Sequence, residues 1–241
     1  MITSPQNDLS AHRIVSGDEW LAARKVLLAK EKEATRLRDE LARARRDLPW
    51  ERVEKDYLFH GPHGPQTLAQ IFGNARQLIV YHFMFDPQWN EGCKSCSFWA
   101  DTFDGIPVHL KARDIAFAAI SRAPYDRLEP YRKRMGWSFT WLSSFENDFN
   151  HDFGVTFSQA EVDAERTSYN YTVQGHPQCE APGVSVFYKP GDGAVFHTYS
   201  TYGRGIDILN AAYNYIDLAP KGRDEGDASQ SWVRRHDEYD V

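Results

Sequence analysis

The sequence predicts an α/β fold built around a mixed sheet. Apolar segments of strand length at 78–85, 115–121 and 137–143 alternate with stretches of helical pattern. Strands that are separated by helices need crossover connections, so we expect these three to run parallel. Two further apolar segments, 181–188 and 194–200, are joined by a Gly- and Pro-rich turn, which predicts an antiparallel hairpin.

Composition limits the class of protein. A chain of 241 residues with 41% hydrophobic composition is long enough to bury a substantial core. The net charge of −6 gives no general attraction to nucleic acid or to anionic lipid. Residues 1–9 have neither a basic start nor an apolar signal segment, and three cysteines, an odd number, are typical of a reducing compartment. We therefore expect a cytoplasmic protein that binds neither nucleic acid nor membranes.

The first element is a long helix from Asp18 to about Arg46, a stretch without Gly or Pro, and residues 1–48 form a helical extension. Apolar residues recur there every seven positions: Trp20, Leu27, Ala34, Leu41 and Leu48. One interpretation is a coiled coil that makes a homodimer. The other is a helix that lies across its own domain with a solvated charged face. We favour the second, because charged residues at 24, 30 and 31 interrupt the stripe.

Residues 49–220 read as one domain, with a polar tail over 221–241. The elements expected in order are a strand near 53–59, a helix at 68–72, the strand 78–85, a helix from Cys93 to Phe103 stopped by Gly105, a helix at 106–113, the strand 115–121, a helix at 124–135, the strand 137–143, an insertion over 144–180, and the hairpin. The last is a helix at 205–217, whose inward residues are expected to be Ile208, Leu209, Ala212, Tyr213 and Ile216.

Two cysteines two residues apart follow the first strand of the predicted parallel core. If Cys93 begins a helix, unpaired backbone amides and the helix dipole lower the pKa of its thiol. Cys96 then lies about one turn further on, where it can form an intramolecular disulfide with Cys93. This pattern predicts a thiol–disulfide oxidoreductase, and the interpretation without chemistry is a pair of cysteines that merely pack.

Several motifs together resemble known families. Parallel strands with this dithiol after the first of them, a Pro-led strand in a terminal hairpin and a final helix resemble the thioredoxin fold. The short helix at 68–72 and the segment 152–155 resemble its peroxiredoxin and AhpC/TSA branch. The segments 50–57, 79–85, 92–101, 121–124, 134–137 and 197–200 are similar to the bacterial DUF899 family of thioredoxin-like proteins, over about residues 10–225.

The resemblance implies roles for individual residues. It makes Cys93 the nucleophile, Cys96 the resolving thiol, and Pro182 a cis proline that faces the dithiol and binds substrate. Tyr81, His82 and Trp99 are further candidates for the substrate pocket, although a buried, hydrogen-bonded histidine is the other interpretation of position 82. The implied partner is a protein or small-molecule thiol or disulfide, without a cofactor.

The motif also departs from these families. Gly92 replaces the Trp that precedes the first cysteine of thioredoxins, and Lys94-Ser95 replaces Gly-Pro. The Pro and Thr that precede a peroxidatic cysteine are absent, so a thiol-dependent peroxidase is the weaker alternative.

Two other classes of function stay open. Cys93, Cys96, His176 and Cys179 could form a zinc or iron site, whereas the alternative is that His176 and Cys179 are ordinary loop residues. The chain could also be a non-catalytic interaction module that presents its long helix and aromatic surface.

Overall fold

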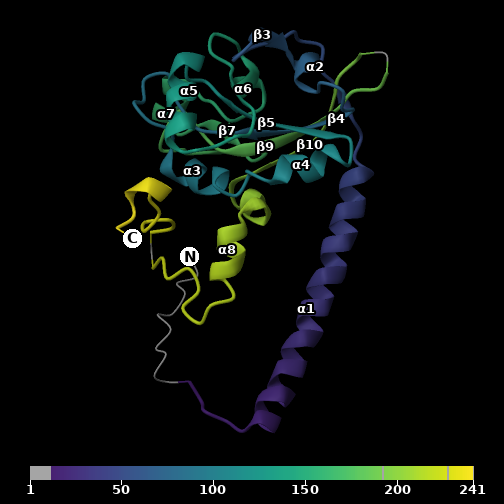
Figure 1. Cartoon of the computed structure of the whole chain (residues 1–241), viewed down its shortest axis with the longest axis vertical. Coiled ribbons are helices and arrows are strands. Elements are labelled where there is room, and N and C mark those ends of the chain that lie inside the picture. Colours follow the sequence, from purple (N-terminus) through teal and green to yellow (C-terminus); the bar gives the residue numbers. More distant parts are fainter. Residues whose placement is uncertain (1–11, 192, 227, 241) are drawn as a thin grey trace.

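The fold is a mixed α/β sheet with helices on both faces, as the computed structural model shows for residues 12–191, 193–226 and 228–240 (Figure 1). The strand order in the described part is β1-β10-β9-β4-β5-β6-β2-β3. The strands are β1 (Glu51–Arg52), β2 (Leu58–Gly61), β3 (Gly64–Thr67), β4 (Gln77–His82), β5 (Ile115–Ser121), β6 (Trp141–Ser143), β9 (Gly183–Tyr188) and β10 (Phe196–Tyr202). A separate hairpin is formed by β7 (Thr167–Tyr169) and β8 (Thr172–Gln174).

Helices cover both faces of this sheet, and the long N-terminal helix extends away from it (Figure 1). They are α1 (Gly17–Arg46), α2 (Leu68–Ile71), α3 (Lys94–Ala100), α4 (Ile106–Lys111), α5 (Tyr125–Arg134), α6 (Phe149–Asp152), α7 (Gln159–Asp163) and α8 (Ala211–Ile216), with 3-10 turns η2 (Gly203–Leu209) and η3 (His236–Glu238). No helix in the described part of the chain is both long enough and apolar enough to cross a membrane.

Strand β4 occupies the middle of the sheet. It pairs in parallel with β5 and antiparallel with β9, and β9 continues into the antiparallel hairpin with β10. The parallel core, the hairpin and the dithiol after β4 confirm the predicted thioredoxin-like topology. Because a strand with neighbours on both sides is fixed along its whole length, the end of β4 gives the dithiol a rigid foundation.

The two faces of the sheet have separate cores. One core contains Tyr81, Phe103 and the buried side of α3, and Figure 1 shows α3 and α4 on this face. The other contains Val80, Phe149 of α6 and Leu68 of α2, on the opposite face. Adjacent residues of β4 therefore contribute to different cores, as strand alternation requires.

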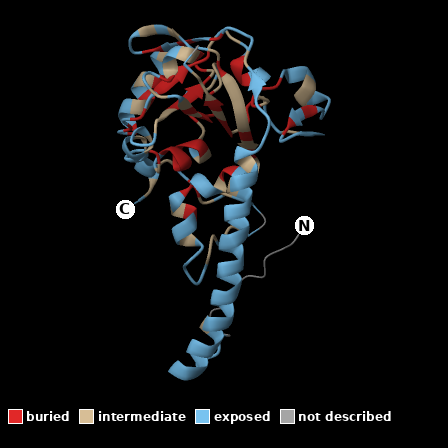
Figure 2. Ribbon diagram, turned by 90° about the vertical axis from the view of Figure 1, so that its right-hand side faces the viewer, coloured by how far each residue is buried: buried red, intermediate tan, exposed pale blue. Residues whose placement is uncertain are grey.

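The long N-terminal helix is confirmed, but its predicted placement is wrong. Ser16 caps α1, because its side chain accepts from the Glu19 amide while the Glu19 carboxylate accepts from the Ser16 amide. The helix does not lie across the domain. It extends away from it, and no residue within it is buried (Figure 2). The apolar residues of this helix do not pack against an apolar surface of the described domain, and they stay exposed.

Asp104 explains why the third parallel strand is shorter than predicted. Its carboxylate accepts hydrogen bonds from the amides of Ser138 and Phe139, at 3.0 Å and 3.2 Å. The amides are thereby withdrawn from the sheet, so β6 begins only at Trp141. On the other side, α3 ends at Ala100 rather than at Phe103, and Gly105, with φ +85°, begins α4 instead of ending α3.

The predicted last helix is divided in two. Asn210 separates η2 from α8, and its side-chain oxygen accepts from the Tyr213 amide at 3.0 Å, which starts a new helix. Tyr213 is buried as predicted. Ile208 and Leu209 are exposed, however, because the tighter winding of η2 turns them away from the sheet.

Candidate active site

The connection between β4 and α3 is held close to the aromatic core. The Cys93 amide donates to the Met84 carbonyl at 3.0 Å, which folds the loop 85–92 back onto the end of β4. Gly92 packs so closely that an added Cβ would stand 2.8 Å from Phe83 and 3.0 Å from Tyr131. Only glycine allows this close approach. Steric crowding therefore explains why glycine, and not the Trp of thioredoxin-type motifs, precedes Cys93.

Cys93 occupies the N-cap position of α3, as predicted. Its pKa falls from an ordinary value of 9.0 to about 6. The largest cause is a hydrogen bond from the Cys96 thiol, and the backbone amides of Cys96 and Ser95 add to it, whereas burial works in the opposite direction. A thiol with this pKa is largely ionised at neutral pH, and the thiolate is the nucleophilic form.

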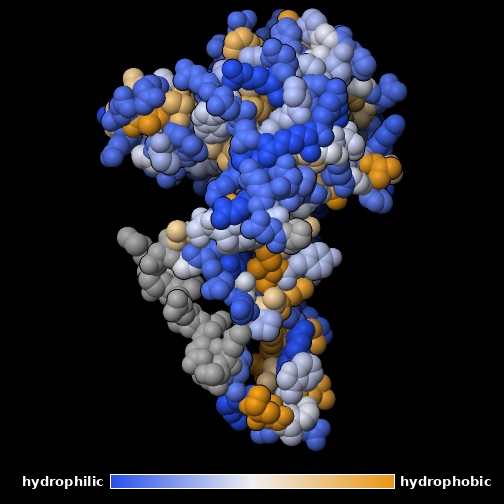
Figure 3. Space-filling model, turned by 60° about the vertical axis from the view of Figure 1, so that its left-hand side comes forward, coloured by the Kyte–Doolittle hydropathy of each residue, from blue (hydrophilic) through white to orange (hydrophobic). Residues whose placement is uncertain are grey.

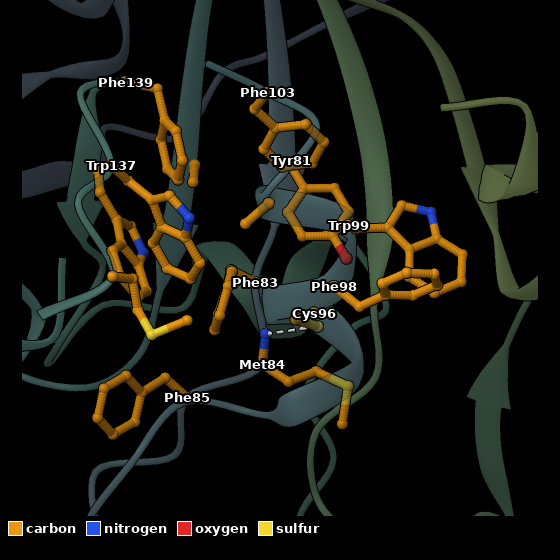
Figure 4. Packing of buried hydrophobic residues seen from close by; sticks show 14 of the residues in the cluster. Tyr81, Phe83, Met84, Phe85, Cys96, Phe98, Trp99, Phe103, Trp137 and Phe139 are labelled. Carbon is orange, nitrogen blue, oxygen red and sulfur yellow. Dashed lines mark hydrogen bonds between the residues drawn. The ribbon is translucent and has the colours of Figure 1, made fainter. Parts of the chain in front are cut away.

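Cys96 has the opposite character. It is fully buried in the aromatic core, and its sulfur accepts a hydrogen bond from the Met84 amide at 3.4 Å (Figure 4). Burial raises its pKa well above 9.0, and the neighbouring Cys93 thiolate raises it further. Both thiols are free. The pair therefore consists of an ionised, half-buried sulfur and a protonated, buried one.

A cavity of about 220 Å³ opens beside the buried sulfur. Three of the predicted pocket residues, Tyr81, Trp99 and Pro182, line it together with Cys96. The rest of its wall comes from Met84, Ser95, Gly203, Arg204, Ile206, Asp207 and Gln230. Cys93 is not among these lining residues, and Lys94 separates it from Ser95 in the sequence. The indole Nε1 of Trp99 donates to the Ile206 carbonyl at 3.0 Å, so η2 is fixed against α3 at this wall.

Tyr81 brings a polar group to the dithiol. Its ring packs edge-on against Phe103, and its hydroxyl is buried without a hydrogen-bond partner among the described residues (Figure 4). Because the same hydroxyl can donate a hydrogen bond to the Cys96 thiolate, it lowers the pKa of Cys96. Burial raises that pKa by more, so the net pKa stays above its ordinary value. Tyr81 is therefore placed to donate a hydrogen bond when Cys96 ionises.

His82 does not line this cavity, which corrects the prediction that it contributes to the pocket. Strand alternation sends its side chain to the opposite face, where it is buried between Phe149 and Phe153. Its Nε2 is 2.8 Å from Ser185 Oγ. Burial lowers the pKa of His82 to about 3, so the ring is neutral. Position 82 is thus the hydrogen-bonded core histidine of the alternative interpretation.

Pro182 faces the cavity, but its peptide bond is trans. The structure has no cis peptide bond within the described residues, so the cis proline expected from the thioredoxin resemblance is wrong. The Pro182 carbonyl accepts a hydrogen bond from the Tyr169 hydroxyl at 2.7 Å. The β7–β8 hairpin of the insertion therefore already provides a hydrogen-bond donor to the backbone carbonyl that precedes β9.

The predicted alternative metal site is not formed. No group of three or more His, Cys, Asp or Glu side chains is arranged to hold a metal ion in the parts of the chain that the structure describes. The His176 ring packs against Phe157 and Tyr169, and the Cys179 thiol donates to Gln159 at 3.6 Å. Both residues belong to the packing of the insertion, and they do not join Cys93 and Cys96.

The C-terminal tail contributes contacts that the sequence did not reveal. Arg235 donates from Nη2 to the Gly92 carbonyl at 2.9 Å and from Nε to the Tyr131 hydroxyl at 2.8 Å. Val233 is fully buried, and Trp232 packs against Phe98 of α3. The tail therefore braces the residue before Cys93. Because this segment has no regular periodicity, no sequence signal could have placed it there.

Comparison with known proteins assigns the chain to a family. The profile of the family described as "Bacterial protein of unknown function (DUF899)" matches residues 9–239, so the chain belongs to the DUF899 family. No curated protein matches it.

Solved structures also resemble the chain. Peroxidoxin BcpB from Mycobacterium tuberculosis has a TM-score of 0.45 and 12% identity, over 70% of this chain and 97% of that chain. The bacterioferritin comigratory protein of Xanthomonas campestris has a TM-score of 0.43 and 11% identity, over 70% and 96%. A protein described as a candidate thiol:disulfide interchange protein DsbE from Chlorobium tepidum has a TM-score of 0.41 and 15% identity, over 73% and 100%.

Proposed function

We propose that the protein is a thiol–disulfide oxidoreductase in which Cys93 is the nucleophile and Cys96 the resolving thiol. The observation that carries this proposal is the placement of the two sulfurs, with half-buried Cys93 at the start of α3 and Cys96 buried one turn further on, where the Met84 amide donates to it. Cys93 has a pKa lowered to about 6, and Cys96 is buried with a raised pKa. Two cysteines that merely pack in a core would both be protonated and inert.

The reaction follows from this asymmetry. The Cys93 thiolate attacks one sulfur of a substrate disulfide, and the other substrate sulfur leaves as a thiolate that takes up a proton. Cys96 then loses its proton and attacks the Cys93 sulfur of the mixed disulfide. The second substrate sulfur leaves, and a Cys93–Cys96 disulfide forms. The substrate gains two electrons and the protein loses two, which a dithiol reductant must restore.

The cavity beside Cys96 supports a substrate that presents a small apolar group next to its sulfur. Its walls are formed mainly by Tyr81, Met84, Trp99 and Ile206, with Arg204 and Asp207 as the charged residues. Such a lining suits a peptide or small-molecule disulfide better than a highly charged one. Since a cycling dithiol depends on a supply of reductant, we place the protein in the cytoplasm.

Reduction of insulin disulfides by dithiothreitol tests the proposal. We expect the wild-type protein to accelerate the reaction, and Cys93→Ser to lower the rate to background, a loss of roughly a thousandfold or more. Cys96→Ser should accumulate a mixed disulfide on Cys93, detectable by mass spectrometry, because no second thiol displaces the substrate. Cys179→Ser is the matched control and should keep full activity.

Peroxide consumption by the same variants tests the alternative. The Cys93 thiolate could also attack a peroxide, but no arginine is among the main groups that lower its pKa. Activity toward peroxide with none toward disulfides would replace the proposal with a thiol-dependent peroxidase. Wild-type insulin reduction equal to that of Cys93→Ser would remove the disulfide-exchange proposal.

A further inference from the structure

Helix α1 carries an apolar stripe that the described part of the chain does not cover. Trp20, Leu27, Leu37 and Leu41 are 60%, 50%, 55% and 49% exposed. Figures 1 and 2 show the helix extending away from the sheet, and Figure 3 shows hydrophobic side chains on the elongated lower part of the molecule. Exposure of this much apolar surface on one face of a helix points to a partner.

The stripe has the repeat of a coiled coil. Counting heptads from Trp20 as an a position places Trp20, Leu27, Ala34, Leu41 and Leu48 at a, and Ala23, Lys30, Leu37 and Ala44 at d. One d position, Lys30, is charged. A single charged seam residue lowers the stability of a coiled coil but does not abolish it, and it helps to fix the register of the helices.

The flanking charges identify the partner and its direction. The g positions are Glu19, Val26, Glu33 and Glu40, and the e positions are Arg24, Glu31, Arg38 and Arg45. Arg24 also pairs with Glu31 of its own helix at 2.8 Å. In a parallel pair, each g residue faces the e residue of the next heptad in the other helix, so Glu19, Glu33 and Glu40 each face an arginine. In an antiparallel pair, g faces g and e faces e, so most of these charges would meet a charge of the same sign. The pattern is therefore complementary to a second, parallel copy of itself.

The attachment of α1 to the domain leaves this seam accessible. Near its end the helix contacts the domain through Arg45, whose guanidinium lies 5.4 Å from the centre of the Tyr199 ring, and Ala42 and Arg45 are half-buried. The seam residues Leu41 and Ala44 remain exposed beside them. A 30-residue helix is about 45 Å long, so four heptads are available to a partner.

We propose that α1 forms a parallel, two-stranded coiled coil with α1 of a second copy. The dimer holds two dithiol domains at the same end of the rod. This inference rests on α1 alone and does not depend on the proposed chemistry.

Sedimentation and light scattering of the full chain test the dimer. We expect twice the chain mass of 27.7 kDa for the wild type. Leu37→Lys with Leu41→Lys should weaken the dimer a hundredfold or more, because it places charges in the seam. Since these side chains are exposed in the single chain, the alkylation rate of Cys93 should stay unchanged. A wild type that is monomeric up to about 100 µM, or a dimer that persists in the double variant, would overturn the proposal.

Charge reversal tests the direction. In the parallel dimer, Glu33→Arg should weaken association about tenfold, and adding Arg38→Glu should restore it. Asp39→Arg, at an outward f position, makes the same change of charge and should have little effect on the dissociation constant. A Glu33→Arg variant that associates more tightly would indicate an antiparallel coiled coil and would overturn the parallel arrangement.

Discussion

Tyr81 and His82 are neighbours in one strand, but their side chains lie on opposite faces of the sheet and are buried in different surroundings. Tyr81 faces Cys96, and its buried hydroxyl has no hydrogen-bond partner within the described residues. His82 faces a chain of hydrogen bonds that runs through Ser185 and Ser200 to His197, with distances of 2.8, 2.8 and 2.7 Å.

The difference shows how burial acts on reactive groups. On the Tyr81 face, burial coexists with donors that favour a thiolate, so one thiol is activated. On the His82 face, the Ser185 hydroxyl is hydrogen-bonded to Nε2 of the imidazole, and burial keeps the ring neutral. A second cavity, of about 480 Å³, opens on that face near His197 and Tyr57 and away from the cysteines. The comparison predicts that substitutions on the two faces affect different properties.

The largest effect should appear in the alkylation of the cysteines. Since the pKa of Cys93 is about 6, its reaction with iodoacetamide should reach half its maximum near pH 6. At pH 7 it should react up to about a hundredfold faster than a thiol of ordinary pKa, because roughly nine-tenths of it is ionised. Mass spectrometry of each cysteine, with Cys179 as internal comparator, measures this. A midpoint above pH 8 would contradict the asymmetry.

His82 should affect stability in acid and leave the dithiol unchanged. Its pKa in the folded state is about 3, below the ordinary 6.5, so the unfolded chain binds the proton more readily. Stability is therefore lost as the pH falls below 6.5, by roughly 2 kcal/mol at pH 5. His82→Leu should remove this part of the loss.

Urea unfolding of His82→Leu and the wild type at pH 7 and pH 5 measures that difference. Carboxylates far from position 82 contribute equally to acid destabilisation of both proteins and cancel in the comparison. An equal loss of stability in both would show that position 82 is not the buried neutral group, and a changed alkylation rate of Cys93 would show that the faces are coupled.

Tyr81→Phe should have the smallest effect, on the resolving step. The hydroxyl donates to Cys96 only when that sulfur ionises, so its loss should slow closure of the Cys93–Cys96 disulfide about tenfold. Stopped-flow release of the second substrate thiol reports that step. Tyr57→Phe, which removes a hydroxyl that donates to Asp152 on the other face, is the matched control and should close at the wild-type rate.

The positions of the strands and of the dithiol were predictable from local patterns. The apolar run at 115–121 coincides with β5, and Cys93 begins a helix as its place after an apolar strand indicated. The two wrongly predicted element boundaries have different causes. Asp104 binds amides about 35 residues away, and Asn210 caps a helix that no break in the apolar pattern announced.

The sequence by itself determined the α/β order, the long helix and the place of Cys93 at a helix start, because strand and helix periods and the pattern that begins a helix are local properties. Only the tertiary structure decided that Tyr81 and not His82 faces the dithiol, that His176 and Cys179 stay away from it, and that Arg235 braces Gly92. Those outcomes depend on which elements far apart in the chain pack together, and side-chain packing between distant segments leaves no periodic trace in the sequence.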